Sequence, residues 1–210
     1  ISLIFWGVGK TAAVALIGRF IACGLGFIGF FFAFIGGSII HSILEKFSEA
    51  FMTIPSLLLA LTLSFIMEQG FFSIAITIGI SEWSFNQKWL LSRLNSISNR
   101  TFIKASVSLG SSKLHIFNYH IKPHIITDIK SLFFIYFPTS ILTVASLEFL
   151  GLSTIDKIPG LGYQIAAYKD LIFLYPNISL PPILMIVVLV FFAIHIKRLT
   201  DERMKAIRNL

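Results

Sequence analysis

The 210-residue chain is 56% hydrophobic and contains 22 Phe, while only 13% of its residues are charged. Because an average soluble domain carries about 25% charged residues, this composition excludes a soluble globular domain and indicates a polytopic membrane protein. The single cysteine, Cys23, excludes a disulfide within the chain and any metal site built from several cysteines.

Long apolar runs predict the membrane spans. About 20 apolar residues are needed to cross the ~30 Å hydrocarbon core of a bilayer as a helix. Five runs of about this length predict spans at 11–35, 50–67, 72–91, 125–147 and 178–196. The expected fold class is therefore an all-α membrane protein, with one transmembrane domain over residues 1–210 and a polar loop at about 93–124.

The basic residues predict an orientation. If the first span runs from outside to inside, most Lys and Arg fall in cytoplasmic segments, as the positive-inside rule requires. The outer segments then keep Lys10, Lys157 and Lys169. The net charge of +7 is thus assigned to orientation and lipid headgroups, and nucleic acid is not an expected partner.

The loop contains an amphipathic stretch over residues 101–123. Apolar residues recur at helical spacing, and Gly110 interrupts the pattern. Glycine fits the left-handed position that ends a helix, and Ser111 or Ser112 can cap the next one. The stretch predicts two short amphipathic helices joined at a tight Gly turn, with an apolar surface for a partner.

This stretch also resembles a known motif. Lys104, Ala105 and Ser106, then Gly110, then Ile121 and Pro123 are similar to the "EAA" cytoplasmic loop of ABC importer permeases. Lys104 replaces the acidic residue of that motif, and Ser106 replaces its second Ala. The resemblance implies a type I ABC importer permease fold, in which this loop is the ATPase-coupling loop.

Further stretches resemble the dipeptide, oligopeptide and nickel branch of these permeases. They are Gly36-Gly37, Lys46 with Glu49, the run 54–60, Trp83 with Lys88, the run 147–152 and the turn 159–162. We expect Glu49 near the start of a helix, where it complements the helix dipole, and Pro55 in the first turns. In that family one more span precedes the position matching Ser2, so we expect the sequence to begin inside a longer permease.

Three polar residues inside predicted spans are candidates for a translocation path. Glu82 and Asn86 lie one helical turn apart, and intramembrane ionisable groups are often functional. The alternative for Glu82 is a local pair with Lys88 or a solvated position. Arg19 lies beside a spacing of Gly18, Ala22 and Gly26 that permits close helix approach; we expect it to snorkel, to form a buried pair or to face the path.

The resemblance implies a permease subunit of a binding-protein-dependent importer for peptides, nickel or metal chelates. It would be a multi-pass protein of the bacterial inner membrane, with its C-terminus and coupling loop in the cytoplasm. Its expected partners are a second, homologous permease subunit, cytoplasmic ATPase subunits that bind ATP and Mg²⁺, an extracytoplasmic solute-binding protein and lipid. We expect no catalytic residue, bound cofactor or metal site in this chain, since Pro123 breaks the helical face between His120 and His124.

Two other functions remain open from the residues alone. A secondary transporter not coupled to ATP usually contains inverted repeats and broken helices, and neither is evident here. An intramembrane hydrolase needs a nucleophile with its base or a ligand cluster, and neither H-E-x-x-H nor G-x-S-x-G occurs in the sequence.

Overall fold

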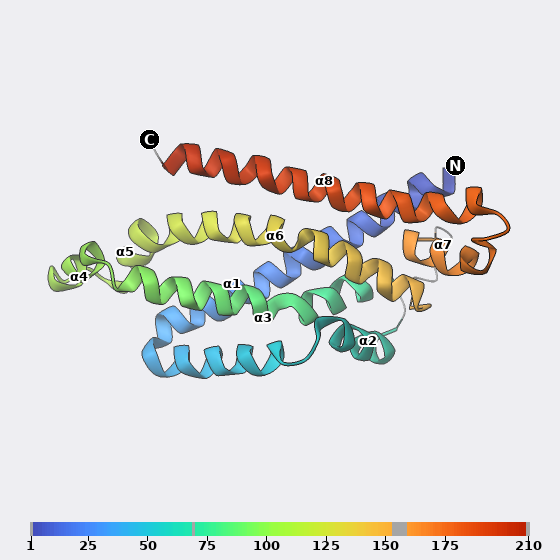
Figure 1. The fold of residues 1–210 in the computed structure, drawn as a ribbon. Helices are drawn as coiled ribbons and strands as arrows, with labels where there is room; N and C mark the ends of the chain where they lie inside the picture. The colour runs from blue at the N-terminus through green and yellow to red at the C-terminus, as the bar shows by residue number, and fades with distance from the viewer. Residues whose placement is uncertain (1, 69, 153–158, 209–210) are drawn as a thin grey trace.

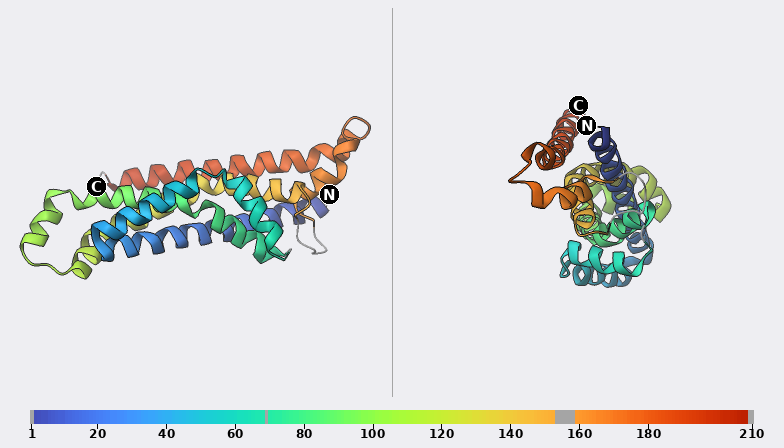
Figure 2. Two further views of the ribbon diagram at one scale, coloured as in Figure 1. Left: turned by 90° about the horizontal axis from the view of Figure 1, so that it is seen from below. Right: turned by 90° about the vertical axis from the view of Figure 1, so that its right-hand side faces the viewer.

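The chain folds into long helices that lie along one common direction (Figures 1 and 2). The computed structural model describes residues 2–68, 70–152 and 159–208, with side chains as far as residue 200. The elements in these ranges are all helical: α1 (Ser2–Met52), α2 (Ser56–Ile66), α3 (Phe71–Ser98), α4 (Thr101–Ser108), α5 (Lys113–Ile116), the π-helix η1 (Phe117–Ile121), α6 (Lys122–Phe149), α7 (Leu161–Tyr168), the 3₁₀ turn η2 (Lys169–Leu171) and α8 (Pro176–Arg208).

The first element, α1, is two helices joined at a break. Gly37 has φ 76° and ψ −163°, a backbone conformation that a residue with a Cβ adopts only under strain. The chain reverses direction at this point, and residues 38–52 run back along α3 (Figures 1 and 2). The Gly36-Gly37 pair is therefore a turn between antiparallel helices.

The helix expected over 50–67 is not continuous. α1 ends at Met52, and α2 begins at Ser56 after Pro55. Proline has no N–H for the helical ladder and disfavours helical backbone at the residue before it, so the helix breaks here. α2 has 11 residues, about 16 Å, which is too short to cross a bilayer alone. Glu49 lies near the end of α1, so its expected position at a helix start is wrong.

Three of the described helical segments are long and apolar enough to cross a membrane: Ser2–Met52, Lys113–Phe149 and Pro176–Thr200. α3 has the length, with 28 residues, but carries several polar and charged side chains on its buried face. α4 and α5 lie at one end of the bundle, whereas α7 and the N-terminus lie at the other (Figure 1).

Two apolar cores lie one after the other along the bundle. The core nearer α7 includes Val14, Ile78 and Val144. The core nearer the loop includes Phe30, Leu94 and Leu132, together with the buried residues of α4, α5 and η1. Between them, α1, α3 and α6 each contribute polar side chains at the same level.

Candidate functional site

Gly110 ends α4 in the way that the sequence predicts. Its φ is 77°. The Ser111 N–H donates to the Ser106 carbonyl at 3.1 Å, and the Gly110 N–H donates to the Val107 carbonyl at 2.9 Å. These two bonds form a Schellman motif, the standard C-terminal cap that uses a left-handed glycine. The tight glycine turn is confirmed.

The second helix of the loop differs from the expectation. Ser112 caps α5 by accepting a hydrogen bond from the His115 N–H at 3.2 Å. After one turn, however, the chain widens into η1 and continues directly into α6. Pro123 lacks the N–H that would bond the Tyr119 carbonyl, which favours a wider turn before it. Ile121 and Pro123 thus belong to one continuous helical segment and do not end a separate helix.

The motif residues of the loop fall into different environments. Lys104, Ala105 and Gly110 are exposed, whereas Ile121 is buried in the core near the loop. The Ser106 hydroxyl lies 3.2 Å from His120 Nε2 and joins α4 to η1. The two sides of the loop are therefore linked by a side-chain contact, and part of the motif lies on the loop's surface.

The loop has both buried and exposed apolar residues. Its buried apolar residues are Ile103, Ile116, Phe117 and Ile121. Its exposed ones are Phe102, Val107, Leu109, Leu114 and Tyr119, and Leu109 at the turn is 86% exposed. Several exposed apolar side chains on one loop are typical of a surface that binds another protein or a membrane.

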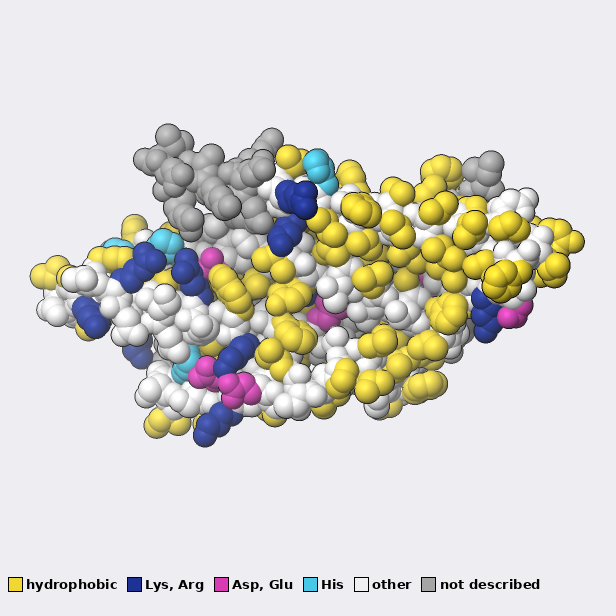
Figure 3. All heavy atoms as spheres, in the orientation of Figure 1, with side chains coloured by type: hydrophobic (Ala, Val, Ile, Leu, Met, Phe, Trp, Pro, Cys, Tyr) yellow, Lys and Arg dark blue, Asp and Glu magenta, His cyan; other side chains and the backbone are white. Residues whose placement is uncertain are grey.

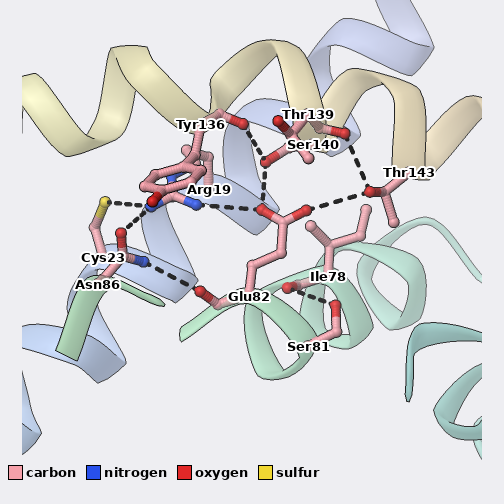
Figure 4. Close-up of polar contacts among 10 residues, drawn as sticks. All are labelled: Arg19, Cys23, Ile78, Ser81, Glu82, Asn86, Tyr136, Thr139, Ser140 and Thr143. Atoms are coloured by element: carbon pink, nitrogen blue, oxygen red, sulfur yellow. Dashed lines mark hydrogen bonds and ion pairs between the residues drawn. The ribbon is translucent and has the colours of Figure 1, made fainter. Parts of the chain in front are cut away.

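A buried polar cluster lies midway along the bundle and contains all three candidate path residues (Figure 4). Arg19 Nη1 lies 3.2 Å from Glu82 Oε2, and neither residue is more than 3% exposed. Asn86 Oδ1 accepts a hydrogen bond from Arg19 Nη2. From α6, the Ser140 and Thr143 hydroxyls donate to the Glu82 carboxylate at 2.6 and 3.3 Å. Three helices are thereby joined through one carboxylate.

Two more side chains complete the surroundings of the guanidinium. Cys23 Sγ lies 3.6 Å from Arg19 Nη2, and the ring of Tyr136 lies 5.1 Å from the guanidinium carbon. Arg19 Nε has no partner among the described residues. Because an unpaired charge costs several kcal/mol in an apolar interior, Arg19 and Glu82 depend on each other.

This geometry decides between the alternatives for Arg19 and Glu82. Arg19 forms the buried pair, which confirms one of its expected alternatives, and it does not snorkel. The local pair of Glu82 with Lys88 is wrong too: Lys88 Nζ lies 3.0 Å from Glu45 Oε1 and also contacts Glu49. Arg19, Glu82 and Asn86 are enclosed within one chain, and a role in the translocation path stays a prediction.

Small residues on α1 allow this close packing. A Cβ at Gly18 would lie 2.9 Å from Ile78 Cβ, and one at Gly26 would lie 2.7 Å from Asn86 Cβ. Both distances are too short for real atoms, so α1 and α3 approach as closely as the Gly18, Ala22 and Gly26 spacing predicts.

A second buried carboxylate, which the sequence reading did not single out, lies at the α7 end. Glu148 Oε2 accepts hydrogen bonds from the Thr11 hydroxyl and the Gly162 N–H, both at 3.1 Å. Thr11 Oγ1 in turn accepts from the Leu161 N–H at 3.1 Å. Glu148 thus caps α7 and ties it to α1 and α6. An acidic residue at the end of an apolar span was the signal for it.

A third ionic contact, also missed, closes the base of the loop. Arg93 near the end of α3 donates from Nε to Asp128 Oδ2 on α6 at 2.9 Å.

Among the described residues, no three His, Cys, Asp or Glu side chains come together as a metal site requires.

The comparisons with known proteins agree with this architecture. The chain is 24% identical over 144 residues to the glutathione transport system permease protein GsiD of Shigella dysenteriae serotype 1 (strain Sd197), which covers 69% of this chain and 48% of that protein. It is 27% identical over 110 residues to the oligopeptide transport system permease protein OppC of Bacillus subtilis (strain 168), covering 52% and 36%. The chain thus spans about half the length, or less, of these curated relatives.

The fold is that of an ABC transporter permease. A solved structure of the MetNI methionine ABC transporter, in an inward facing conformation, superposes with a TM-score of 0.68 at 16% identity. The superposition covers 94% of this chain and 96% of that chain. The family model described as binding-protein-dependent transport system inner membrane component matches residues 26–206. Because that match covers most of the sequence, the chain belongs to the family of inner membrane components of binding-protein-dependent transport systems.

Proposed function

We propose that this chain works as a permease subunit of an ABC importer for peptides. Its family is one of transport components and not of enzymes, which agrees with a chain that supplies a path and no chemistry. Two relatives belong to a glutathione and an oligopeptide transport system, and both of these solutes are peptides. Nickel and metal chelates are compatible with the motifs but have less support.

The observation that carries the proposal is the loop formed by α4, α5 and η1. It projects from one end of the bundle (Figure 1), exposes apolar side chains, and is held in shape by the Gly110 turn and the contact between Ser106 and His120. Such a shaped apolar projection suits docking into a separate ATPase subunit, which would bind ATP and Mg²⁺.

The distribution of charge supports an orientation with the loop in the cytoplasm. On the visible face of the molecule, Lys and Arg gather toward the loop end, while hydrophobic side chains cover most of the remainder (Figure 3). By the positive-inside rule, this distribution supports a cytoplasmic position for the loop and for the C-terminal end of α8. The α7 end would face the extracytoplasmic binding protein, and a second permease subunit would complete the path.

The proposal is tested by purification and uptake. The affinity-tagged chain, purified from the membranes of its host, should retain an ATPase subunit and a second permease. Proteoliposomes with this complex and its binding protein should accumulate radiolabelled glutathione or a labelled pentapeptide only when ATP is inside the compartment that the loop faces. Ni²⁺ is the comparison solute.

Two outcomes would contradict the proposal. If the purified chain retained no ATPase subunit, the proposal that it is a subunit of an ABC importer would be contradicted. Uptake that persists without ATP and collapses when an ionophore dissipates the ion gradients would instead indicate a secondary transporter.

A further inference from the structure

The turn at Gly37 lies at the same end of the bundle as the coupling loop, defined here as α4, α5 and η1 (Figures 1 and 2). It joins the first long helix to the antiparallel segment 38–52. A Cβ at Gly37 would meet no heavy atom within 4 Å, so the turn is not wedged between neighbours. Its direction depends on the backbone of Gly37 and on what contacts the helix before it.

The coupling loop contacts that helix. Lys113 Nζ donates to the carbonyl of Ile35, two residues before Gly37, at 3.1 Å. The ring of Phe117 lies 5.4 Å from the ring of Phe31 and 5.4 Å from that of Phe34. Both contacts reach the last turns of the helix before the reversal.

These two contacts differ in strength. Lys113 is exposed, so its hydrogen bond competes with water and contributes little to stability by itself. Phe117 is 8% exposed and belongs to the core that joins α1, α3 and α6 near the loop. A close-packed aromatic ring transmits displacement to its neighbours, because the interior leaves no free space to absorb it. The Lys113 hydrogen bond adds directionality to this packing contact, because it fixes the position of one carbonyl beside the turn.

We propose that Phe117 and Lys113 are positioning residues through which the coupling loop acts on the turn at Gly37. This inference rests on the proposed function, in which an ATPase moves the loop. A shift of α4 and α5 then displaces Phe117 in η1. That displacement tilts the end of the first helix, and the segment 38–52 changes its angle to the remainder of the bundle.

The experiment measures the movement directly. Cys23, the only cysteine, is replaced by Ser, and spin labels are attached to Ile39→Cys, just past the turn, and Leu142→Cys on α6. Both positions are exposed. Distances between the labels are recorded by pulsed electron paramagnetic resonance in the complex with its ATPase subunit, without nucleotide and with ATP and vanadate.

The variants are Phe117→Leu, which keeps an apolar side chain but removes the ring, and Lys113→Met, which removes the donor. Lys113→Arg keeps a donor at this position and should preserve the hydrogen bond to the Ile35 carbonyl. Lys130→Met, which removes an exposed charge on α6, is the matched control. The label distance should shift with nucleotide in the unmodified complex and in the control, and Phe117→Leu should lose most of that shift. Lys113→Met should lose part of it, and solute transported per ATP should fall about two- to thirtyfold in Phe117→Leu.

The two levels of the proposal fail in different ways. If the unmodified chain retains no ATPase, the proposed function fails and this inference with it. If the ATPase is retained by every variant and the nucleotide-dependent shift in Phe117→Leu and Lys113→Met equals that of the control, the proposed function stands and the inference is overturned.

Discussion

The Glu82 carboxylate on α3 and the Arg19 guanidinium on α1 are 63 residues apart in sequence and 3.2 Å apart in the fold. Both side chains are almost fully enclosed. Ser140 and Thr143 from α6 bind the same carboxylate, so the pair determines how three helices meet. A buried pair of this kind contributes little net stability, because the cost of removing both charges from water offsets their attraction.

Removing one partner of this pair should be costly, and removing both should be much less so. Arg19→Met leaves Glu82 charged and unpaired, and we expect a loss of about 3–5 kcal/mol. Arg19→Met combined with Glu82→Leu should regain most of that loss. The measurement is a double-mutant cycle on unfolding in detergent micelles. Additive losses in the double variant would show that the two charges do not interact.

Replacing Gly110 with Val should distort the coupling loop. A β-branched residue resists the observed φ of 77°, and the strain amounts to about 1–2 kcal/mol for a left-handed residue. We expect the protein to remain in the membrane while ATP hydrolysis no longer drives uptake. Gly24→Ala is the control, because an added Cβ there meets nothing within 4 Å. Normal uptake in Gly110→Val would count against the importance of this turn.

Changing Lys104 to Glu should strengthen the hold on the ATPase subunit. Lys104 is exposed on α4, at the position where the resembling motif carries an acidic residue. Co-purification of the ATPase at rising salt concentration measures the effect, with Lys130→Glu as the charge-matched control. Equal retention by both variants would mean that the charge at residue 104 does not contact the partner.

Truncating Glu148 should loosen α7. Glu148→Ala removes the acceptor for the Thr11 hydroxyl and the Gly162 N–H, at a cost of about 1–3 kcal/mol for buried groups left without a partner. Amide hydrogen exchange at Leu161 and Gly162 should then accelerate. Glu148→Gln keeps one acceptor oxygen, so its exchange rate should fall between those of the unmodified chain and the Ala variant. Unchanged exchange in the Ala variant would show that Glu148 does not stabilise the start of α7.

Local chemistry in the sequence predicted local structure well. Gly110 ends a helix and Ser112 begins one because each conformation depends on a few neighbouring residues. The break before Pro55 was missed because a run of apolar residues has the same mean hydropathy whether or not its helix is continuous. Proline was the available signal.

The ionic partners were beyond what spacing can predict. Lys88 stands six residues from Glu82 but contacts Glu45 and Glu49, because the chain reverses at Gly37 and brings segment 38–52 beside α3. Arg19 finds Glu82 only once glycines let α1 and α3 pack closely. Such pairs depend on which faces meet, and that information is distributed over the whole bundle.

The hydrogen bonds of the π-helix η1 span one residue more than those of the α-helices it joins. Deleting a single residue there would restore a regular helix, and because the wide turn already absorbs the extra residue, the helical segments on its two sides would keep nearly the same facing around the axis of α6. This junction can therefore gain or lose one residue while the loop and the span that follows it keep their relative orientation.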